Sequence, residues 1–344
     1  MAKKDSRTKA FATTSAKKSR KNSKNSKRLR HHIVICIFVV VALILVVFAS
    51  LIIAQIIGKS NNSSPSPAPN ENVEYILRDA GNIKMGNLLL INDEFKYTLP
   101  QDLDSMINIK YQYLPNDADQ QIIKIGNAYT YALTYDSICL TRETLDMFSQ
   151  MIFDYCNNTD SNSTNKNSAS NLEVAWGGYS ESTRNEYDED ITKYGKDYYD
   201  HALGTTVTLK VNTPSTVITE SMLKEQFSWI YENAYKYGFI VRVPEKCKDH
   251  TSFDSSKRVH LRYVGIEHAT YIAQNEICFE EYLELIRTKH TFENPLVINV
   301  DSGKTYNVYY VEYSGNPTSI KVPQNTNYEI SGDNMNGFIV TVEK

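Results

Sequence analysis

The chain has 344 residues, of which 41% are hydrophobic. This length and composition allow a packed core, and they exclude a fully disordered or fibrous protein. The net charge of −3 hides a segregation of charge, because residues 1–32 hold 12 of the 37 basic residues and one acidic residue, Asp5. The rest of the chain holds 25 basic and 39 acidic residues, so a basic arm precedes an acidic body.

An uncharged apolar run follows the basic arm. It extends from Ile33 to Ile57, and its 25 residues exceed the length of about 20 that crosses a bilayer. The run is also longer than the apolar part of a cleaved signal peptide, which has about 7–15 residues. We therefore predict an uncleaved, single-pass transmembrane helix at 33–57. The positive-inside rule then predicts that residues 1–32 are cytoplasmic and that the acidic body is extracellular, at the cell membrane.

The position of the arm beside this run accounts for its charge. Juxtamembrane clusters of Lys and Arg attract anionic lipid, so we expect the membrane as a partner. A nucleic-acid site would be expected to mix aromatic residues with the cations, and the arm has only Phe11. We therefore expect no nucleic acid to bind. Residues 58–72 are rich in Pro, Ser and Asn, which predicts an extended linker.

Beyond the linker, the pattern predicts strands and helices without a regular βαβ repeat. This order favours an α+β fold, with a central antiparallel sheet flanked by helices at 73–290 and a small β module at 291–344. Strands are predicted at Gly86–Asp93, from Leu172, from Gly204 and in four segments after residue 294. Helices are predicted at Thr141–Cys156, Ser221–Gly238 and through Glu280–Arg287.

The five cysteines leave the disulfide state open. Cys36 lies in the apolar run, and an exported compartment would permit bridges among the other four. Four cysteines allow three pairings, and buried thiols fit the sequence equally well. No closely spaced Cys/His cluster occurs, which argues against a structural zinc site. The four cysteines of the acidic body are Cys139, Cys156, Cys247 and Cys278.

The order of motifs over about residues 73–290 resembles that of the zinc D-alanyl-D-alanine carboxypeptidases of the VanY type. The most specific parts are Asn233-Ala234, Tyr237-Gly238-Phe239-Ile240 with Arg242 and Pro244, Arg262-Tyr263-Val264-Gly265, and His268-Ala269. The resemblance implies a carboxypeptidase fold, a zinc ion held by His, Asp and His, and peptidoglycan stem peptides as ligands.

The metal positions that the resemblance implies are only partly kept. His201 and Gly204 match the first zinc motif, and His260 matches the last ligand. Thr208 stands where the family has its aspartate. Because a neutral hydroxyl is not among the usual protein ligands of zinc, His201 and His260 are the candidate metal ligands of a weakened site. Zinc remains a candidate cofactor, but we expect it to be bound weakly or not at all.

Two further positions of the motif change their charge class. Lys257 stands at the position of the general-base glutamate, and Ser180 stands where the family has an arginine. Loss of a general base typically costs about 100-fold to 10,000-fold in rate, and loss of an oxyanion-stabilising group costs a similar factor. Tyr179 and Arg262 match the motifs, and they are the candidate substrate-binding residues.

Two hypotheses follow. In the first, the protein is a membrane-anchored, non-catalytic member of the cell wall machinery that binds stem peptides or a cell-envelope protein. In the second, it is an active zinc carboxypeptidase that removes the terminal D-alanine, with Asp200 or Asp254 replacing the lost carboxylate. The substitutions at Thr208, Lys257 and Ser180 favour the first.

Overall fold

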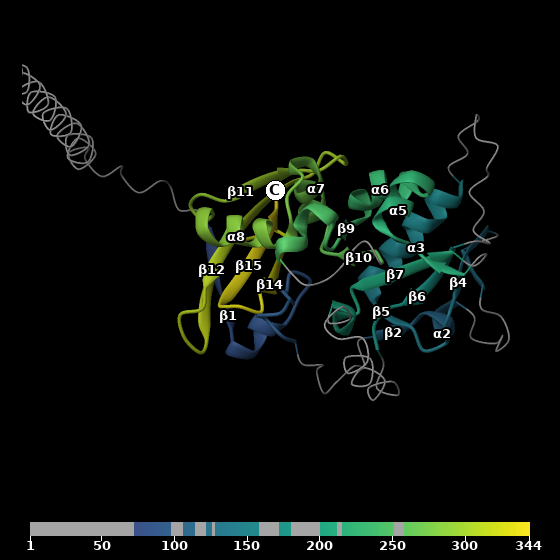
Figure 1. Cartoon of the computed structure of the whole chain (residues 1–344). Coiled ribbons are helices and arrows are strands. Elements are labelled where there is room, and N and C mark those ends of the chain that lie inside the picture. Colours follow the sequence, from purple (N-terminus) through teal and green to yellow (C-terminus); the bar gives the residue numbers. More distant parts are fainter. Residues whose placement is uncertain are drawn as a thin grey trace, which may run out of the picture. The chain divides into compact units, whose positions relative to one another are not determined.

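The computed structural model describes the chain in eight stretches, and it supports a mixed helix and sheet fold (Figure 1). The predicted transmembrane helix at 33–57, the arm and nearly all of the linker lie outside the described residues, so they stay predictions. Within the described stretches, no helix is long and apolar enough to cross a membrane. The stretches are residues 72–97, 106–113, 122–125, 128–157, 172–179, 200–211, 215–250 and 258–344.

A seven-stranded sheet carries the centre of the fold. Six strands run in the order β3 (Ile122–Ile125), β4 (Ala128–Leu133), β6 (Leu172–Trp176), β7 (Thr206–Val211), β10 (His260–Tyr263) and β9 (Phe239–Val241), and β8 (Thr216–Val217) pairs with β7. Neighbours are antiparallel, as predicted, except β4 and β6, which are parallel. The connection between these two passes through a helix, which is the type of crossover that parallel neighbours require.

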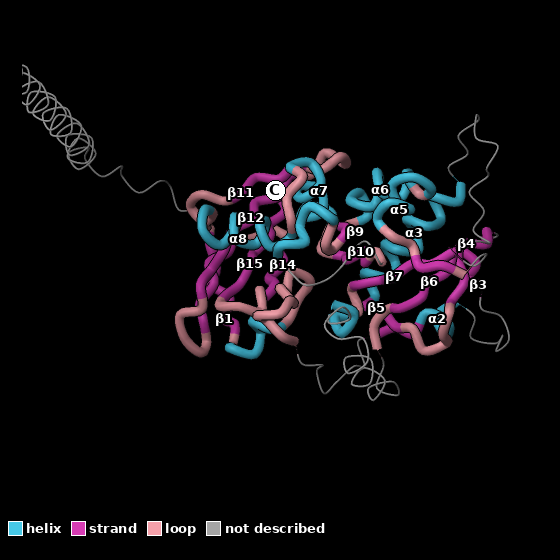
Figure 2. The backbone as a smooth tube through the Cα atoms, viewed as in Figure 1, coloured by secondary structure: helices cyan, strands magenta, loops and turns pink. Residues whose placement is uncertain are grey.

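The crossover helix is α3 (Arg142–Asn157), and it confirms the helix predicted at 141–156. It follows a two-stranded sheet of β2 (Met106–Asn108) and β5 (Cys139–Thr141), with α2 (Ile109–Tyr113) close by. Phe148 lies edge-on to the rings of Tyr131 and Phe239, at centroid distances of 5.2 and 6.1 Å. Figure 2 shows α3 as a cyan helix among the magenta strands of this part of the molecule. One face of α3 is buried through Leu145, Phe148, Met151, Ile152 and Tyr155.

The helix predicted at 221–238 is interrupted. The chain forms α5 (Glu220–Gln226), α6 (Ser228–Asn233) and the short 3-10 helix η5 (Ala234–Tyr237). The break falls at Phe227, which leaves helical geometry while its ring is buried against the core. The segment ends at Gly238 with φ 83°, where an added Cβ would lie 2.5 Å from the ring of Tyr263. Glycine is therefore required for the turn into β9.

The strand predicted at 86–93 is wrong. Leu88, Leu89, Leu90 and Ile91 are buried, but among the described residues the segment pairs with no strand. Side chains satisfy much of its backbone instead: Leu88 N donates to Ser331 Oγ at 3.0 Å, and Asn334 Nδ2 donates to Leu90 O at 2.8 Å. An apolar run with turn residues at both ends therefore marks burial here, and not a sheet.

The C-terminal residues form a four-stranded antiparallel sheet in the order β11 (Leu296–Asn299), β12 (Thr305–Glu312), β15 (Gly337–Glu343) and β14 (Tyr328–Gly332). β14 was not predicted. The predicted strand β13 (Thr318–Pro323) leaves this sheet and pairs with β1 (Val73–Arg78), which precedes the 3-10 helix η1 (Ala80–Lys84). The helices α7 (Ile266–Asn275) and α8 (Phe279–Lys289) share a core with the four-stranded sheet. The residues predicted as a β module at 291–344 thus share a hydrophobic core with helices that precede residue 290.

One disulfide links the start of α8 to the 3-10 helix η6 (Glu245–His250). It joins Cys247 and Cys278, whose Cα atoms are 5.8 Å apart. Cys139 and Cys156 are thiols, and burial raises the pKa of Cys156 to about 11. The structure therefore combines the two states that the sequence left open, one bridge and two thiols.

We predict that removing this bridge destabilises the chain without unfolding it. The double variant Cys247→Ala with Cys278→Ala should lose about 2–4 kcal/mol in urea unfolding, because the bridge closes a loop in the unfolded chain. Its two cysteines are 31 positions apart. Cys156→Ala, which changes a half-buried thiol outside the bridge, is the control and should lose less. Equal stability of the double variant and the unaltered chain would contradict the pairing.

Candidate functional site

Two neighbouring strands bring the predicted metal positions together. His260 begins β10 and is paired with Thr208 of β7 in antiparallel register. His201, in the turn before β7, shares a hydrogen bond of 3.1 Å between its Nε2 and Thr208 Oγ1. The rings of His201 and His260 meet edge-on, with centroids 4.6 Å apart. The three side chains therefore form one cluster, and we call His201 and His260 the histidine pair.

The turn that carries His201 depends on two glycines. Gly204 has φ 65°, and an added Cβ would lie 2.3 Å from Met106 Sδ. Gly178, at the end of the β6 segment, approaches so closely that its own Cβ would lie 2.7 Å from Gly204 Cα. Larger residues at either position would displace the turn, and with it the imidazole of His201.

The histidine pair is buried and next to positive charge. His201 and His260 are 0% and 2% exposed. Burial lowers the pKa of His260 well below 6.5, and the neighbouring His201, Arg258 and Arg242 lower it further. His260 is thus neutral at physiological pH. The guanidinium of Arg258 lies 5.7 Å over the ring of Trp176, which is paired with Thr208 across β6 and β7.

The described donors do not fit a catalytic zinc ion. Such sites usually offer three protein ligands drawn from imidazole, carboxylate and thiolate, whereas this cluster offers two imidazoles and a neutral hydroxyl. Across the described stretches, one group alone brings three His, Cys, Asp or Glu donors within ligand distance, and it consists of His250, Cys278 and Glu281. Its sulfur belongs to the disulfide. In this part of the chain, no carboxylate joins the histidine pair.

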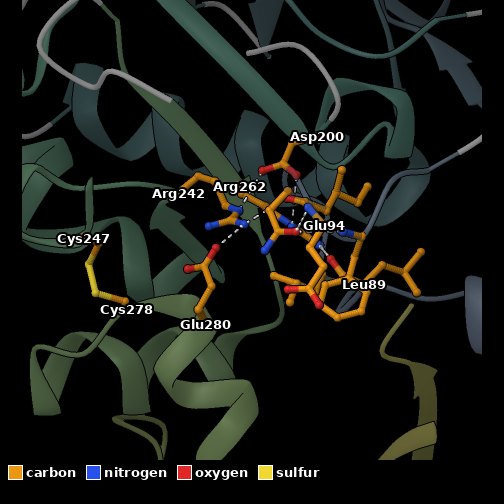
Figure 3. A network of polar contacts seen from close by, with 12 residues as sticks. Leu89, Glu94, Asp200, Arg242, Cys247, Arg262, Cys278 and Glu280 are labelled. Carbon is orange, nitrogen blue, oxygen red and sulfur yellow. Dashed lines mark hydrogen bonds and ion pairs between the residues drawn. A yellow bond between two sulfur atoms is a disulfide. The ribbon is translucent and has the colours of Figure 1, made fainter. Parts of the chain in front are cut away.

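Asp200 does not replace the lost ligand. Its Oδ2 lies 2.8 Å from Arg242 Nε, and its Oδ1 lies 3.4 Å from Arg262 Nη1 (Figure 3). The carboxylate is therefore committed to two guanidinium groups, and the suggestion that it binds the metal is wrong. Asp254, the other residue suggested for this role, lies outside the described residues.

Arg242 and Arg262 belong to a buried network of four charges, which we call the arginine network. Arg242 Nη2 lies 2.7 Å from Glu280 Oε1 and donates to Ile91 O at 3.1 Å. Both guanidinium groups lie over the ring of Phe279, at 5.1 and 4.6 Å from its centroid. Two cations and two anions thus balance each other. The network consists of Asp200, Arg242, Arg262 and Glu280.

Burial and partners act in opposite directions on the two cations of this network. Burial disfavours the charge of Arg242, but Asp200 and Glu280 outweigh it and raise the pKa. Burial lowers the pKa of Arg262 to about 10, with Asp200 opposing the shift. Both side chains therefore stay charged at neutral pH.

The predicted substrate-binding residues are both buried. Arg262 is 0% exposed, and its Nη2 donates to Leu89 O at 2.6 Å and to Asn87 O at 3.2 Å. These contacts make it a support for the segment at 86–93, whereas the prediction of a substrate-binding role rested on its match to the motif. Tyr179 is 7% exposed and packs against Ala202. Neither residue presents a free polar surface to a substrate.

The remaining predicted positions lie outside the described residues, so their roles stay predictions. They are Lys257 at the general-base position and Ser180 at the arginine position. Sequence reasoning missed the role of Glu280, which faces Arg242 from the first turn of α8. The sequence signal that could have indicated an acidic partner was Arg242 itself, because an arginine that is buried requires an anion nearby.

The chain is similar to proteins that are named as carboxypeptidases. It is 29% identical over 265 residues to a D-alanyl-D-alanine carboxypeptidase of Enterococcus faecium, across 76% of each chain. It is 44% identical over 59 residues to the putative carboxypeptidase YodJ of Bacillus subtilis, which is 17% of this chain and 21% of that protein. No family model matches the chain.

A solved structure shares the fold. This is the vancomycin resistance D,D-dipeptidase VanXYg in complex with a D-Ala-D-Ala phosphinate analogue, with a TM-score of 0.58 and 19% identity over 79% of this chain and 99% of that one. The described domain therefore has a carboxypeptidase-like fold. The sequence is also similar to that of D-alanyl-D-alanine carboxypeptidases over about three quarters of its length, at 29% identity over 76% of the chain.

We predict that the arginine network is essential for folding stability. Asp200→Asn should lower the free energy of unfolding by about 3 kcal/mol or more, because it leaves two buried cations with one anion. Asp146→Asn is the matched control, because that carboxylate is 58% exposed and 3.9 Å from Arg142. The control should change stability by less than about 0.5 kcal/mol in the same urea titration. Similar losses in both variants would contradict the network's role.

Proposed function

We propose that the protein is a membrane-anchored, extracellular member of the VanY-type carboxypeptidase family that binds stem peptides, or a cell-envelope protein, without cutting them. The observation that carries this proposal is the contact between His201 and Thr208. A neutral hydroxyl occupies the place of an anionic ligand, and it engages a ring nitrogen that a metal would need. The predicted apolar run at 33–57 supports the anchor and the extracellular side.

The charge around the histidine pair also favours binding over hydrolysis. Arg258 and Arg242 act electrostatically on His260, and the described residues place no carboxylate with the pair. Such an environment opposes a divalent cation and favours an anion. Lys257 and Ser180, at the base and arginine positions of the motif, would each remove a further catalytic group.

A peptide carboxylate suits this environment. The related enzyme of Enterococcus faecium is named for D-alanyl-D-alanine, and the VanXYg structure holds an analogue of the same dipeptide. Arg258 would offer a cation to the terminal carboxylate, and Trp176 beneath it would offer an apolar surface. We therefore favour a stem peptide that ends in D-Ala-D-Ala as the ligand.

The second candidate function is an active zinc carboxypeptidase with a rearranged site. What favours it is that the two imidazoles remain adjacent, with His260 in the neutral form that metals bind. In that case the third ligand would have to come from a residue such as Asp254, outside the described stretches.

Zinc content and product release distinguish the two functions. The full chain, purified in a mild detergent, should contain less than one zinc per chain and should release no D-alanine from a stem pentapeptide. Calorimetry should nevertheless show that the pentapeptide binds, and that a tetrapeptide without the last D-alanine binds more weakly. Release of D-alanine that a chelator abolishes would reject the proposal in favour of the second function.

Restoring the acidic groups should restore metal binding. The double variant Thr208→Asp with Lys257→Glu should bind zinc at least tenfold more tightly than the unaltered chain, because it supplies an anionic ligand and removes a cation. Competition with a chromophoric chelator measures this affinity. Thr208→Asn with Lys257→Gln is the matched control of similar shape without the negative charges. No difference between the two double variants would mean that the motifs are misaligned.

A further inference from the structure

A cavity lies between the β1–β13 ribbon and the C-terminal sheet. Its volume is about 360 Å³, which falls within the range of about 300–1,000 Å³ that is usual for small-molecule sites. Val73, Pro323 and Gln324 come from the ribbon side, and Asn307, Tyr309 and Val342 come from β12 and β15. The wall is completed by Asn72, Phe292 and Pro295. None of these residues belongs to the histidine pair or to the arginine network.

The lining of this cavity carries no charged side chain. It combines two aromatic rings, two prolines and two valines with the three amide side chains of Asn72, Asn307 and Gln324. A charged ligand would find no counter-ion in such a lining, and a purely apolar ligand would leave the buried Asn307 Oδ1 without a hydrogen bond. The lining therefore favours a neutral ligand that has both C–H faces and polar groups.

The aromatic residues are held in place before any ligand arrives. Phe292 and Tyr309 meet at 87° with centroids 5.4 Å apart, and Lys321 Nζ lies 3.9 Å over the ring of Phe292. The hydroxyl of Tyr309 donates to Lys321 O at 2.6 Å. Rings fixed in this way can pack against a ligand with little loss of conformational entropy.

One polar atom in this wall has a hydrogen-bonding capacity that the protein does not use. Asn307 Oδ1 is buried, and among the described residues it has no hydrogen-bond donor. A buried acceptor without a donor is costly, at about 1–3 kcal/mol, so it is rarely kept without a reason. A ligand N–H or O–H that enters the cavity would satisfy it.

We propose that this cavity binds a neutral saccharide, with an N-acetylated amino sugar as the best match. The faces of a pyranose ring carry C–H groups that pack on aromatic and proline surfaces. The face of an aromatic ring is the negative side of its quadrupole, so it attracts these C–H groups. The acetamido N–H donates to Asn307 Oδ1, and the acetamido methyl packs against valine. The proposal does not depend on the peptide-binding function, since the two sites share no residue.

The test uses the full chain in detergent and a β-1,4-linked trimer of N-acetylglucosamine as the probe. Calorimetry should show saturable binding by the unaltered chain, and Asn307→Leu should weaken it at least tenfold. Asn327→Leu is the matched control, because it makes the same chemical change at an exposed position that is not part of the cavity wall. Its affinity should equal that of the unaltered chain.

A second measurement keeps the proposal testable if Asn307→Leu fails to fold. With valine methyl groups labelled for NMR, the trimer should shift the signals of Val73 and Val342 in the unaltered chain, and leave the signal of the exposed Val297 in place. Absence of binding at millimolar trimer, equal affinity of the two variants, or shifts elsewhere would overturn the proposal. The proposal would also be overturned if a peptide of residues 62–71 shifted the NMR signals of Val73 and Val342 and the trimer did not.

Discussion

Four charges buried together constrain the candidate site more than any other interaction. Removing charged groups from water is expensive, so the arginine network is tolerated only because each guanidinium finds an anion and further acceptors. Its members come from the turn beside His201, from the residue that follows β9, from β10 and from α8. Satisfying these charges fixes the relative positions of four elements, and therefore the positions of both histidines.

The positions of the two histidines also depend on strand register and on backbone geometry. The register of β7 with β10 sets His260 opposite Thr208, and the glycine turn sets His201. Strand pairing, the hydrogen bond to Thr208 and the arginine network thus hold the two imidazoles side by side.

The sequence predicts those helices and site residues that are marked by a pattern among neighbouring residues. Helix α3 follows from the spacing of its buried residues, and the motif order led to His201, His260 and Thr208 before their proximity was known. Sequence reasoning failed where the deciding contacts are distant in sequence. The segment at 86–93 is apolar like a strand, but its backbone is bound by residues near 262 and 331–334. No local pattern signals that.

The pairing of β1 with β13 has a consequence for how the protein is made. Val73 is aligned with Pro323, so the first strand of the domain finds its neighbour only after nearly the whole chain has been synthesised. Contacts between such distant residues slow folding, because a long loop must close before any hydrogen bond forms. Until then, Tyr75 and Leu77 belong to an unpaired strand with two bare edges. Cells that produce this protein need a means of shielding that strand while the chain folds.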